Sequence, residues 1–410
     1  MVSNVSAVTA GTGKETRAQI FYFNDLHGHI EGAERIATAS STFDTANNPQ
    51  IAKFKFSAGD IFIGKSEKKS NLMVEFLNLV SPDAAVLGNH EFDLGPNLSK
   101  QVEKFRAKFI STNLNVTERN KLFDNIRSGR ITRSQVIEKN GEKYGVIGFL
   151  PFDFMKRINI TAQKACEGLS IDDFNKIKEE AQREVAEFKR QGINKVVVIS
   201  HMGNKADTQA VSGIDIIIGG HSHTKIDGIT PGVNYFTSPA GEPVLVTQAE
   251  QNGKYYGVMD VIFDSSGRIK NALNRLSETA QVPKSLLVKY FENLYIGKPE
   301  VIATVEQGTK QVLENTLAES PAASLVADAM RAKSGAQIVF TNTATVKGEI
   351  KPGPLRNRDI EEAMPYFNKV KMYKFSEKDV IEALNGSIQA VINPPHRVGN
   401  LQVSGMRYTI

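Results

Sequence analysis

Short runs of apolar, often β-branched residues alternate with longer amphipathic stretches from residue 19 to about residue 275. The apolar runs are bounded by Gly, Asn, Asp or His, and they are shorter than helices usually are. We therefore predict six buried strands, at Ile20–Phe23, Phe54–Phe56, Ala84–Leu87, Lys195–Ile199, Ile214–Ile218 and Val244–Val246. Their alternation with helical stretches predicts an α/β layered core.

One amphipathic stretch, Ser170–Gln191, predicts a long helix. Acidic residues occupy its first turns and Lys189 and Arg190 lie near its end, which is the polarity that the helix dipole favours. Two reversals predict antiparallel pairs. Asn140-Gly141 lies between two alternating runs, and Ser265–Gly267 follows an apolar run, so both positions favour hairpin turns.

The pattern changes near residue 280. Pro283–Lys298 predicts a single helix, and the residues after it begin with Val301–Ala303, continue with a predicted helix at Pro321–Lys333 and become basic in their last third. We expect a main domain at 19–275, a linker helix at 276–299 and a second domain at 300–410.

Composition narrows the class of protein. The 410 residues suggest two to three domains, and 40% hydrophobic with 23% charged residues excludes wholesale disorder. Cys166 is the single cysteine, so it cannot form an internal disulfide or complete a Cys-rich zinc site. We expect an inert, partly buried thiol there. Any metal site must use His, Asp, Glu, Asn or Gln.

Charge and hydropathy limit the partners. Lys and Arg total 50 and Asp and Glu total 45, giving a net charge of +5, which suits an anionic ligand better than a nucleic acid. No stretch approaches the roughly 18 apolar residues of a transmembrane segment. Residues 1–18 lack the apolar core of a secretory signal, so we expect a cytoplasmic protein or a processed form. No feature indicates the oligomeric state.

Six of the seven histidines lie at or just beyond the carboxyl ends of predicted strands, with acidic and amide residues beside them. Ligands bind at this edge of open α/β sheets, so five separate segments deliver ligand-type side chains to one place. The set is Asp25, His27, His29, Asp60, Asn89, His90, Asp93, His201, His221 and His223.

Imidazole and carboxylate groups without thiolate favour Zn, Mn or Fe, with Mg or Ca possible at carboxylate-rich positions. Asp25 and His27 can face one ion, because residues i and i+2 point to the same side of an extended segment. Two ions about 3.5–4 Å apart polarise a phosphoryl group and generate hydroxide at neutral pH. Asp25 and His27 already supply the ligands that this segment would give to a metal ion, so we expect His29 to lie outside the site. His90 and Asp93 can meet on one helical turn.

These segments resemble the calcineurin-type metallophosphoesterases. They are most similar to the 5′-nucleotidase family, whose members include UDP-sugar hydrolases and 2′,3′-cyclic nucleotide phosphodiesterases and are usually periplasmic or on the cell surface. The matching segments are Asn24–Gly28, Ser57–Asp60, Leu87–Asp93, Ser200–Gly203 and Gly219–Thr224. The resemblance implies a four-layered αββα sandwich, then a linker helix and an α+β C-terminal domain, which we expect to be incomplete at Ile410.

The resemblance also implies a ligand set for two divalent metal ions, which could be Zn, Mn, Mg or Fe. Asp25, His27, Asp60 and His223 would hold the first ion, and Asp60, Asn89, His201 and His221 the second, so that Asp60 bridges them. A metal-bound hydroxide would attack phosphorus in line. His90 would lie unligated beside the phosphate and stabilise developing charge, and Asp93 would orient its imidazole. Glu91 and Phe92 are expected to be structural.

The second domain resembles the family's substrate-specificity domain. Pro365-Tyr366 corresponds to a motif whose aromatic ring stacks on the nucleobase. The family's Asn-Gly-Gly-Ile-Arg motif is replaced here by Asn342–Lys347, and Lys347 stands where the family has a substrate-binding Arg, although the two are not interchangeable. The resemblance implies that Asn342, Lys347 and Tyr366 bind substrate.

The leading hypothesis is a metal-dependent phosphohydrolase acting on nucleoside 5′-monophosphates or related nucleotides. A 2′,3′-cyclic nucleotide phosphodiesterase or a UDP-sugar hydrolase would need the same metal site. From another class, the chain could be a non-catalytic, truncated paralogue that binds metal and ligand, although the His90/Asp93 pair argues against this. A DNA nuclease is disfavoured, because the sequence lacks an aromatic and basic stripe.

Overall fold

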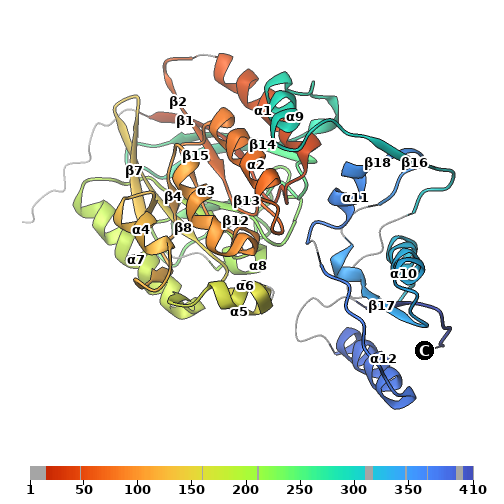
Figure 1. The fold of residues 1–410 in the computed structure, drawn as a ribbon. Coiled ribbons are helices and arrows are strands. Elements are labelled where there is room, and N and C mark those ends of the chain that lie inside the picture. Colours follow the sequence, from red (N-terminus) through yellow and green to blue (C-terminus); the bar gives the residue numbers. More distant parts are fainter. Residues whose placement is uncertain are drawn as a thin grey trace, which may run out of the picture. The chain divides into compact units, whose positions relative to one another are not determined.

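The computed structural model describes residues 15–46, 48–158, 160–209, 212–309, 317–346, 349–366, 368–393 and 400–409. They divide into two compact units (Figure 1). The first extends to Ile63 and from Glu67 to Ile296, and the second holds Gly64–Ser66 and the chain from Gly297 onwards.

The first unit contains two sheets, of which one has seven strands. Five of its strands run parallel, and a long antiparallel hairpin extends it beyond β1. The order is β15 (Ile269–Glu278), β14 (Tyr255–Phe263), β1 (Thr16–Phe23), β2 (Ile51–Ser57), β3 (Ala84–Ala85), β4 (Phe109–Ile110) and β6 (Ile131–Thr132).

The other sheet has six strands. Its four inner strands are parallel and its two edge strands antiparallel. The order is β12 (Tyr235–Thr237), β13 (Pro243–Thr247), β11 (Ile216–Gly219), β10 (Val196–Ser200), β8 (Glu142–Phe149) and β7 (Ser134–Lys139). A separate short pair joins β5 (Leu114–Val116) and β9 (Leu169–Ile171).

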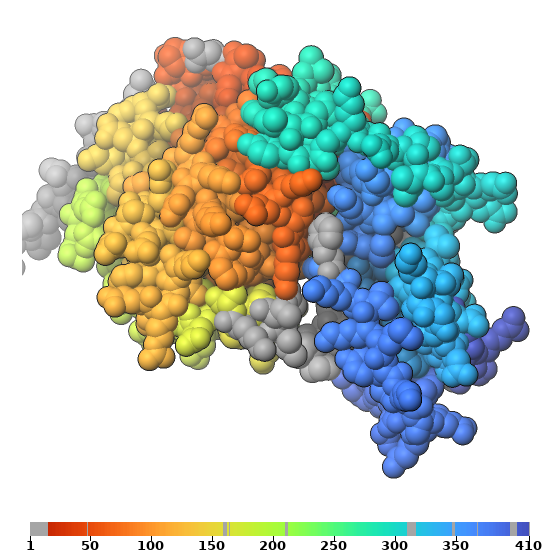
Figure 2. Space-filling view, in the orientation of Figure 1, coloured from red at the N-terminus to blue at the C-terminus, as the bar shows by residue number. Residues whose placement is uncertain are grey.

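Helices cover the outer faces of both sheets. The unit contains α1 (Ile30–Thr45), α2 (Glu67–Val80), the 3₁₀ helix η1 (His90–Asn97), α3 (Leu98–Lys104), α4 (Leu122–Arg127), α5 (Phe154–Arg157), α6 (Ile160–Ala165), α7 (Phe174–Arg190), α8 (Asn204–Asp207), η2 (Thr279–Gln281) and α9 (Leu286–Tyr295). Helices α1, α2 and α9 pack on one another, as Figure 1 shows, and α9 lies at the surface, in teal in Figure 2.

Three buried clusters show how the layers are stacked. Phe21 and Phe23 of β1 pack against α1, α2 and α9, whereas Ile20 and Tyr22 pack against the second sheet. The third cluster joins α7 to the outer face of the second sheet. Because side chains alternate across a strand, each sheet is apolar on both faces. The expected four-layered αββα sandwich is therefore confirmed.

The element boundaries differ from the predictions at several places, of which three are informative. The structure begins α7 at Phe174, because the Asp173 carboxylate accepts the N–H groups of Asn175 and Lys176 and caps the helix; the predicted first residues from Ser170 belong partly to β9. The helix predicted from Pro283 begins at Leu286, after the capping hydroxyl of Ser285. The third predicted strand is only two residues long. Both predicted hairpins are present.

The second unit mixes helices and short strand pairs. One pair joins β16 (Val301–Val305) to β18 (Gly353–Arg356), and another joins β17 (Val339–Asn342) to β19 (Leu401–Ser404). The helices are α10 (Pro321–Ser334), η3 (Thr343–Thr345), α11 (Asn357–Ala363) and α12 (Glu377–Ile392). The domain limits expected from the sequence stay a prediction. No helix in the described parts of either unit is long and apolar enough to cross a membrane.

Candidate functional site

The predicted ligands follow the carboxyl ends of parallel strands in both sheets. Asp25 and His27 come after β1, Asp60 after β2 and Asn89 after β3, while the second sheet supplies the three residues that follow β10 and β11, namely His201, His221 and His223. Their ligand atoms form overlapping groups whose members lie within 4.8 Å of one another: Asp25 with His27 and His223, His27 with Asp60 and His90, and Asp60 with His201 and His221.

The backbone is strained where these side chains originate. Among the described residues, nine that are not glycine have positive φ angles, and five of them are predicted ligands: Asp25, His27, Asp60, His221 and His223. Such residues are uncommon, cost about 1–3 kcal/mol each and concentrate at functional sites. Asp25 and His27 thus converge, but through left-handed backbone conformations rather than the extended segment that we predicted.

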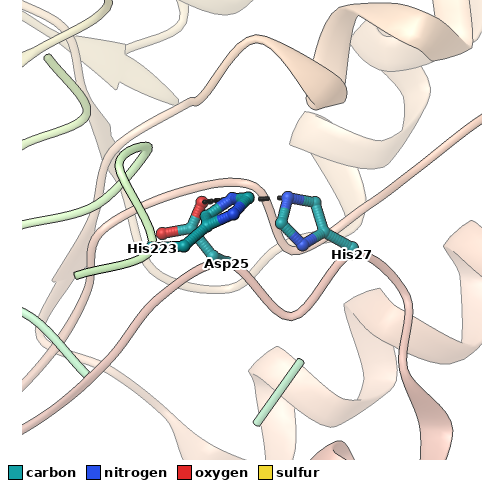
Figure 3. Close-up of side chains that lie close together, drawn as sticks. All are labelled: Asp25, His27 and His223. Carbon is teal, nitrogen blue, oxygen red and sulfur yellow. Dashed lines mark ion pairs between the residues drawn. The ribbon is translucent and has the colours of Figure 1, made fainter. Parts of the chain in front are cut away.

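The Asp25 carboxylate organises one side of the site. Its Oδ1 lies 3.4 Å from Nε2 of His223 and 3.8 Å from Nε2 of His27, and Figure 3 shows both imidazoles turned toward it. Asp25 also accepts a hydrogen bond from Nδ2 of Asn24 at 2.6 Å and one from the backbone N–H of His221 at 2.9 Å. These two donors hold the Asp25 carboxylate in one orientation, and its Oδ1 stays directed toward the imidazoles of His27 and His223.

Asp60 lies where two of the groups meet. Its Oδ2 is 3.0 Å from Nε2 of His201 and 3.5 Å from Nε2 of His27, and its Oδ1 accepts the backbone N–H of His90 at 2.8 Å. The side chain is only 2% exposed. A carboxylate that faces imidazole nitrogens from both groups has the position that a bridging ligand requires.

Two of the buried side-chain atoms that lack hydrogen-bond partners among the described residues belong to predicted ligands: Oδ1 of Asn89 and Nε2 of His201. Nδ1 of His201 lies 2.6 Å from the carbonyl of Ala58, so Nδ1 carries a proton and Nε2, which can hold either a second proton or a metal ion, faces the carboxylates of Asp60 and Asp25. An unpaired buried acceptor costs about 1–3 kcal/mol, and a divalent cation would satisfy all of these groups. The residues therefore fit a metal.

Burial and neighbouring charges shift the pKa values of several side chains in the site. Burial acts to lower the pKa of His201, but the Asp60 and Asp25 carboxylates outweigh it and raise the pKa to about 10. Burial, reinforced by His201, lowers the pKa of His221 to about 3. For Asp60, burial opposes ionisation, yet the nearby imidazoles hold its pKa well below the ordinary value. Without metal, the His201 imidazole is therefore a cation beside the carboxylates of Asp60 and Asp25, and a bound metal ion would replace its Nε2 proton.

Glu91 was expected to be structural, but its sequence position did not show what it does. Its buried carboxylate accepts four backbone N–H groups, those of Gly88 at 2.6 Å, Ile61 at 2.7 Å, Asp60 at 3.0 Å and Phe62 at 3.1 Å. One side chain therefore clamps the loop that carries Asp60 to the loop that carries Asn89 and His90.

Other residues were missed because nothing local distinguishes them. Asn24, next to Asp25, contacts a segment far along the same sequence: its side chain donates to the carbonyl of Glu250 and accepts the N–H of Ala249. The side chain of Gln248 accepts the N–H of Thr224 and donates to the carbonyl of Gly220, so it shapes the loop that carries His221 and His223. These contacts join segments more than 20 residues apart.

The expected His90/Asp93 contact is present, with Nδ1 of His90 2.7 Å from Oδ2 of Asp93. Both lie on η1, a 3₁₀ helix, in which residues i and i+3 eclipse. His29 caps α1, because its Nδ1 accepts the N–H of Gly32 at 3.2 Å, so its observed contact is structural. The catalytic roles of His90 and Asp93 stay predictions.

The remaining candidates are Cys166 in the first unit and the three predicted substrate-binding residues, which follow it in the sequence. Cys166 is more deeply buried than expected: it is 5% exposed and belongs to the buried cluster that also contains Phe21 and Phe23. Burial raises the pKa of its thiol to about 11. Asn342 ends β17, and its Oδ1 accepts the N–H of Ala344 at 2.8 Å. Tyr366 is half-buried in the second unit. Lys347 lies outside the described residues. Substrate binding by these three residues stays a prediction.

Comparisons with known proteins match both parts of the chain. The family described as calcineurin-like phosphoesterase matches residues 18–225, and the 5′-nucleotidase C-terminal domain matches residues 301–410. A trifunctional nucleotide phosphoesterase of Bacillus subtilis is 28% identical over 95% of this chain, and an apyrase of Anopheles gambiae is 30% identical over 94%. The chain spans 29% of the length of the first relative and 74% of the second.

A solved structure is similar to this chain over nearly its whole length. The 5′-nucleotidase precursor of Thermus thermophilus is 26% identical and superposes with a TM-score of 0.75 over 96% of this chain and 82% of that one. The similarity therefore extends through both units and is not confined to the metal-ligand motifs.

Proposed function

Because this chain belongs to the calcineurin-like phosphoesterases and carries a 5′-nucleotidase C-terminal domain, we propose that it is a dinuclear-metal phosphohydrolase acting on nucleoside 5′-monophosphates or related nucleotides. The observation that carries the proposal is the position of Asp60, whose Oδ2 faces Nε2 of His27 from one proposed ligand set and Nε2 of His201 from the other.

In the proposed site, Asp25, His27, Asp60 and His223 hold one divalent ion, and Asp60, Asn89, His201 and His221 hold the other. The orphaned Oδ1 of Asn89 and Nε2 of His201 support the second set. Imidazole with carboxylate and amide suits Zn, Mn or Fe, and Mg is also compatible. Bound ions would polarise the phosphoryl group and lower the pKa of water.

The protein's own contribution to chemistry centres on His90. Asp93 lies 2.7 Å from Nδ1 of His90, so it orients the ring and favours a protonated imidazole. The imidazole would then donate from Nε2 to a phosphoryl or leaving-group oxygen as negative charge develops there. The buried loops around Asp60 keep the carboxylates in place, so little reorganisation is needed during the reaction.

Hydrolysis of AMP, UDP-glucose and 2′,3′-cyclic AMP with added Mn or Zn, followed by chromatography of the products, tests the proposal. AMP would give adenosine and inorganic phosphate, UDP-glucose would give UMP and glucose 1-phosphate, and the cyclic nucleotide would give an AMP monoester. We expect AMP to be hydrolysed fastest. Faster hydrolysis of one of the other substrates would indicate the corresponding phosphodiesterase or UDP-sugar hydrolase. If the metal-loaded protein hydrolysed none of them, the phosphohydrolase proposal would fail and a metal-binding, non-catalytic paralogue would remain.

A further inference from the structure

The loop between β13 and β14 has two residues with strained backbones, although neither is a predicted metal ligand. They are Glu250 and Asn252, whose φ angles are 57° and 58°. Left-handed conformations of residues other than glycine cost free energy and concentrate at functional sites, and asparagine adopts them more readily than most residues do. The strain in this loop therefore calls for a contact that it makes possible.

The backbone of Asn252 lies directly beside the segment that carries Asp25 and His27. Its N–H donates to the carbonyl of Asp25 at 2.7 Å. On its other side the loop meets the first turn of α1, where a Cβ atom on Gly32 would lie 2.5 Å from the carbonyl oxygen of Asn252. Only glycine at that position of α1 leaves room for the loop to approach so closely.

The side chain of Asn252 reaches the imidazole of His27. Its Oδ1 lies 3.4 Å from Nδ1 of His27, whereas Nε2 of the same ring lies 3.5 Å from Oδ2 of Asp60 and 3.8 Å from Oδ1 of Asp25. Figure 3 shows the His27 ring turned toward Asp25. Because an amide oxygen only accepts hydrogen bonds, a neutral His27 in this contact carries its proton on Nδ1 and keeps the lone pair of Nε2 directed at the carboxylates.

The main-chain contacts of His27 leave its ring unspecified. Its N–H donates to the carbonyl of Asp60 at 2.8 Å, which fixes the backbone but neither the rotation of the ring nor the nitrogen that is protonated. An imidazole that binds a metal almost always donates its other N–H to an acceptor, which fixes both. Among the described residues, Oδ1 of Asn252 is placed to do this for His27, as the carbonyl of Ala58 is for His201.

We propose that Asn252 is a positioning residue for His27. By accepting the Nδ1–H, it holds the tautomer in which Nε2 can bind the ion that Asp25 and His223 would share, and it thereby sets the affinity for that ion. The inference rests on the proposed function, because His27 is a ligand only in that site.

Mn titration of the metal-free full-length protein by calorimetry tests this inference. Asn252→Gly removes the acceptor and keeps a residue that adopts positive φ without strain, and we expect it to weaken the binding of one ion about 10–100-fold. Asn252→Asp restores an acceptor and should bind Mn at least as tightly as wild type. Asn140→Gly is the matched control, because Asn140 is exposed in the turn between β7 and β8 and has a φ angle of 54°.

Two further measurements distinguish positioning from general support of the fold. Long-range ¹H–¹⁵N spectra of the metal-free protein at about pH 8, where an imidazole of ordinary pKa is neutral, should show the Nδ1–H tautomer of His27 in wild type and Asn252→Asp. In Asn252→Gly the Nε2–H tautomer should gain population. Hydrolysis of AMP by Asn252→Gly should require more Mn than wild type does, and excess Mn should restore turnover without a change in KM.

An Mn affinity of Asn252→Gly equal to that of wild type would overturn the inference. An equal loss in Asn252→Asp, or an unchanged tautomer in Asn252→Gly, would overturn it as well, since the acceptor would then not be the cause. If wild type binds Mn and only the Asn252 variants behave against expectation, the proposed function is unaffected. If wild type binds Mn as expected but hydrolyses none of the substrates, the proposed function fails and the role of Asn252 stands; if wild type binds no Mn, both fail.

Discussion

Asp60 faces imidazoles of both proposed metal positions, so its replacement should affect both ions. We predict that Asp60→Asn loses at least one metal and lowers phosphate release more than about 100-fold, which exceeds the loss typical of an outer partner of a ligand. Metal analysis of the dialysed variant and its turnover would check this. Full metal content with near wild-type turnover would exclude Asp60 as the bridge.

His90 should behave differently, because we place it beside the substrate and not on a metal. His90→Ala is expected to lower turnover about 10²–10⁴-fold, the usual contribution of a positioned acid or base, and to keep both ions. His29→Asn is the control, since asparagine can still cap α1 and turnover should be unchanged. An equal loss in both variants, or loss of metal from His90→Ala, would contradict the assignment.

At the level of single residues, the sequence indicated which ligand-type side chains gather at the strand ends but not their backbone conformations. The histidines and carboxylates at strand ends could be found because short β-branched runs locate the strands. The left-handed φ angles of Asp25 and His27 could not, because they depend on backbone contacts with the loop after β2, such as the N–H of Asp25 bonded to the carbonyl of Gly59.

The loops after β2 and β3 form one element of the site through Glu91. We predict that Glu91→Gln weakens metal binding about 10–100-fold, as loss of a supporting partner does, because an amide oxygen cannot accept four N–H groups as a carboxylate can. Metal titration would measure this, with exposed Glu179→Gln as the control. Equal metal affinity in both variants would show that the clamp does not support the site.

The connection between β10 and β11 gives a pH prediction away from the site. Burial, with a smaller contribution from Glu242, raises the pKa of Asp215 from 3.8 to about 8, against opposing effects of the Val196 N–H, Lys195 and Lys189. The folded state therefore binds this proton more tightly than the unfolded state. Its stabilising contribution is complete below about pH 4 and is lost as the pH rises to 8.

Asp215→Asn removes that proton uptake. Relative to wild type, we expect the variant to gain stability from pH 5 to pH 8 at a slope of up to about 1.4 kcal/mol per pH unit. Denaturant unfolding at several pH values would measure the difference. A difference that stays constant with pH would show that Asp215 is ionised in the folded state.

Among the elements, regular strands were predictable because their apolar runs are bounded by turn residues. The short elements β3, β4 and β6 have only two residues each, too few for a pattern to mark their limits. The order of strands was also out of reach, since β1 pairs with β14 across more than 200 residues, for example Thr16 with Phe263.

For the molecule as a whole, bound metal should stabilise the fold because the proposed ligands come from both sheets. Removing metal with a chelator should lower the unfolding temperature, and adding Mn at about 100 times its dissociation constant should restore about 2.7 kcal/mol. Calorimetry with and without chelator would show this. An unfolding temperature that ignores both treatments would mean that no metal joins the two sheets.

Anomalous diffraction from crystals of the Mn-loaded protein would locate the proposed ions directly. We predict two metal peaks about 3.5–4 Å apart, both bound by Asp60, with Asp25, His27 and His223 on one and Asn89, His201 and His221 on the other. A single peak, or peaks that do not share Asp60, would contradict the dinuclear site.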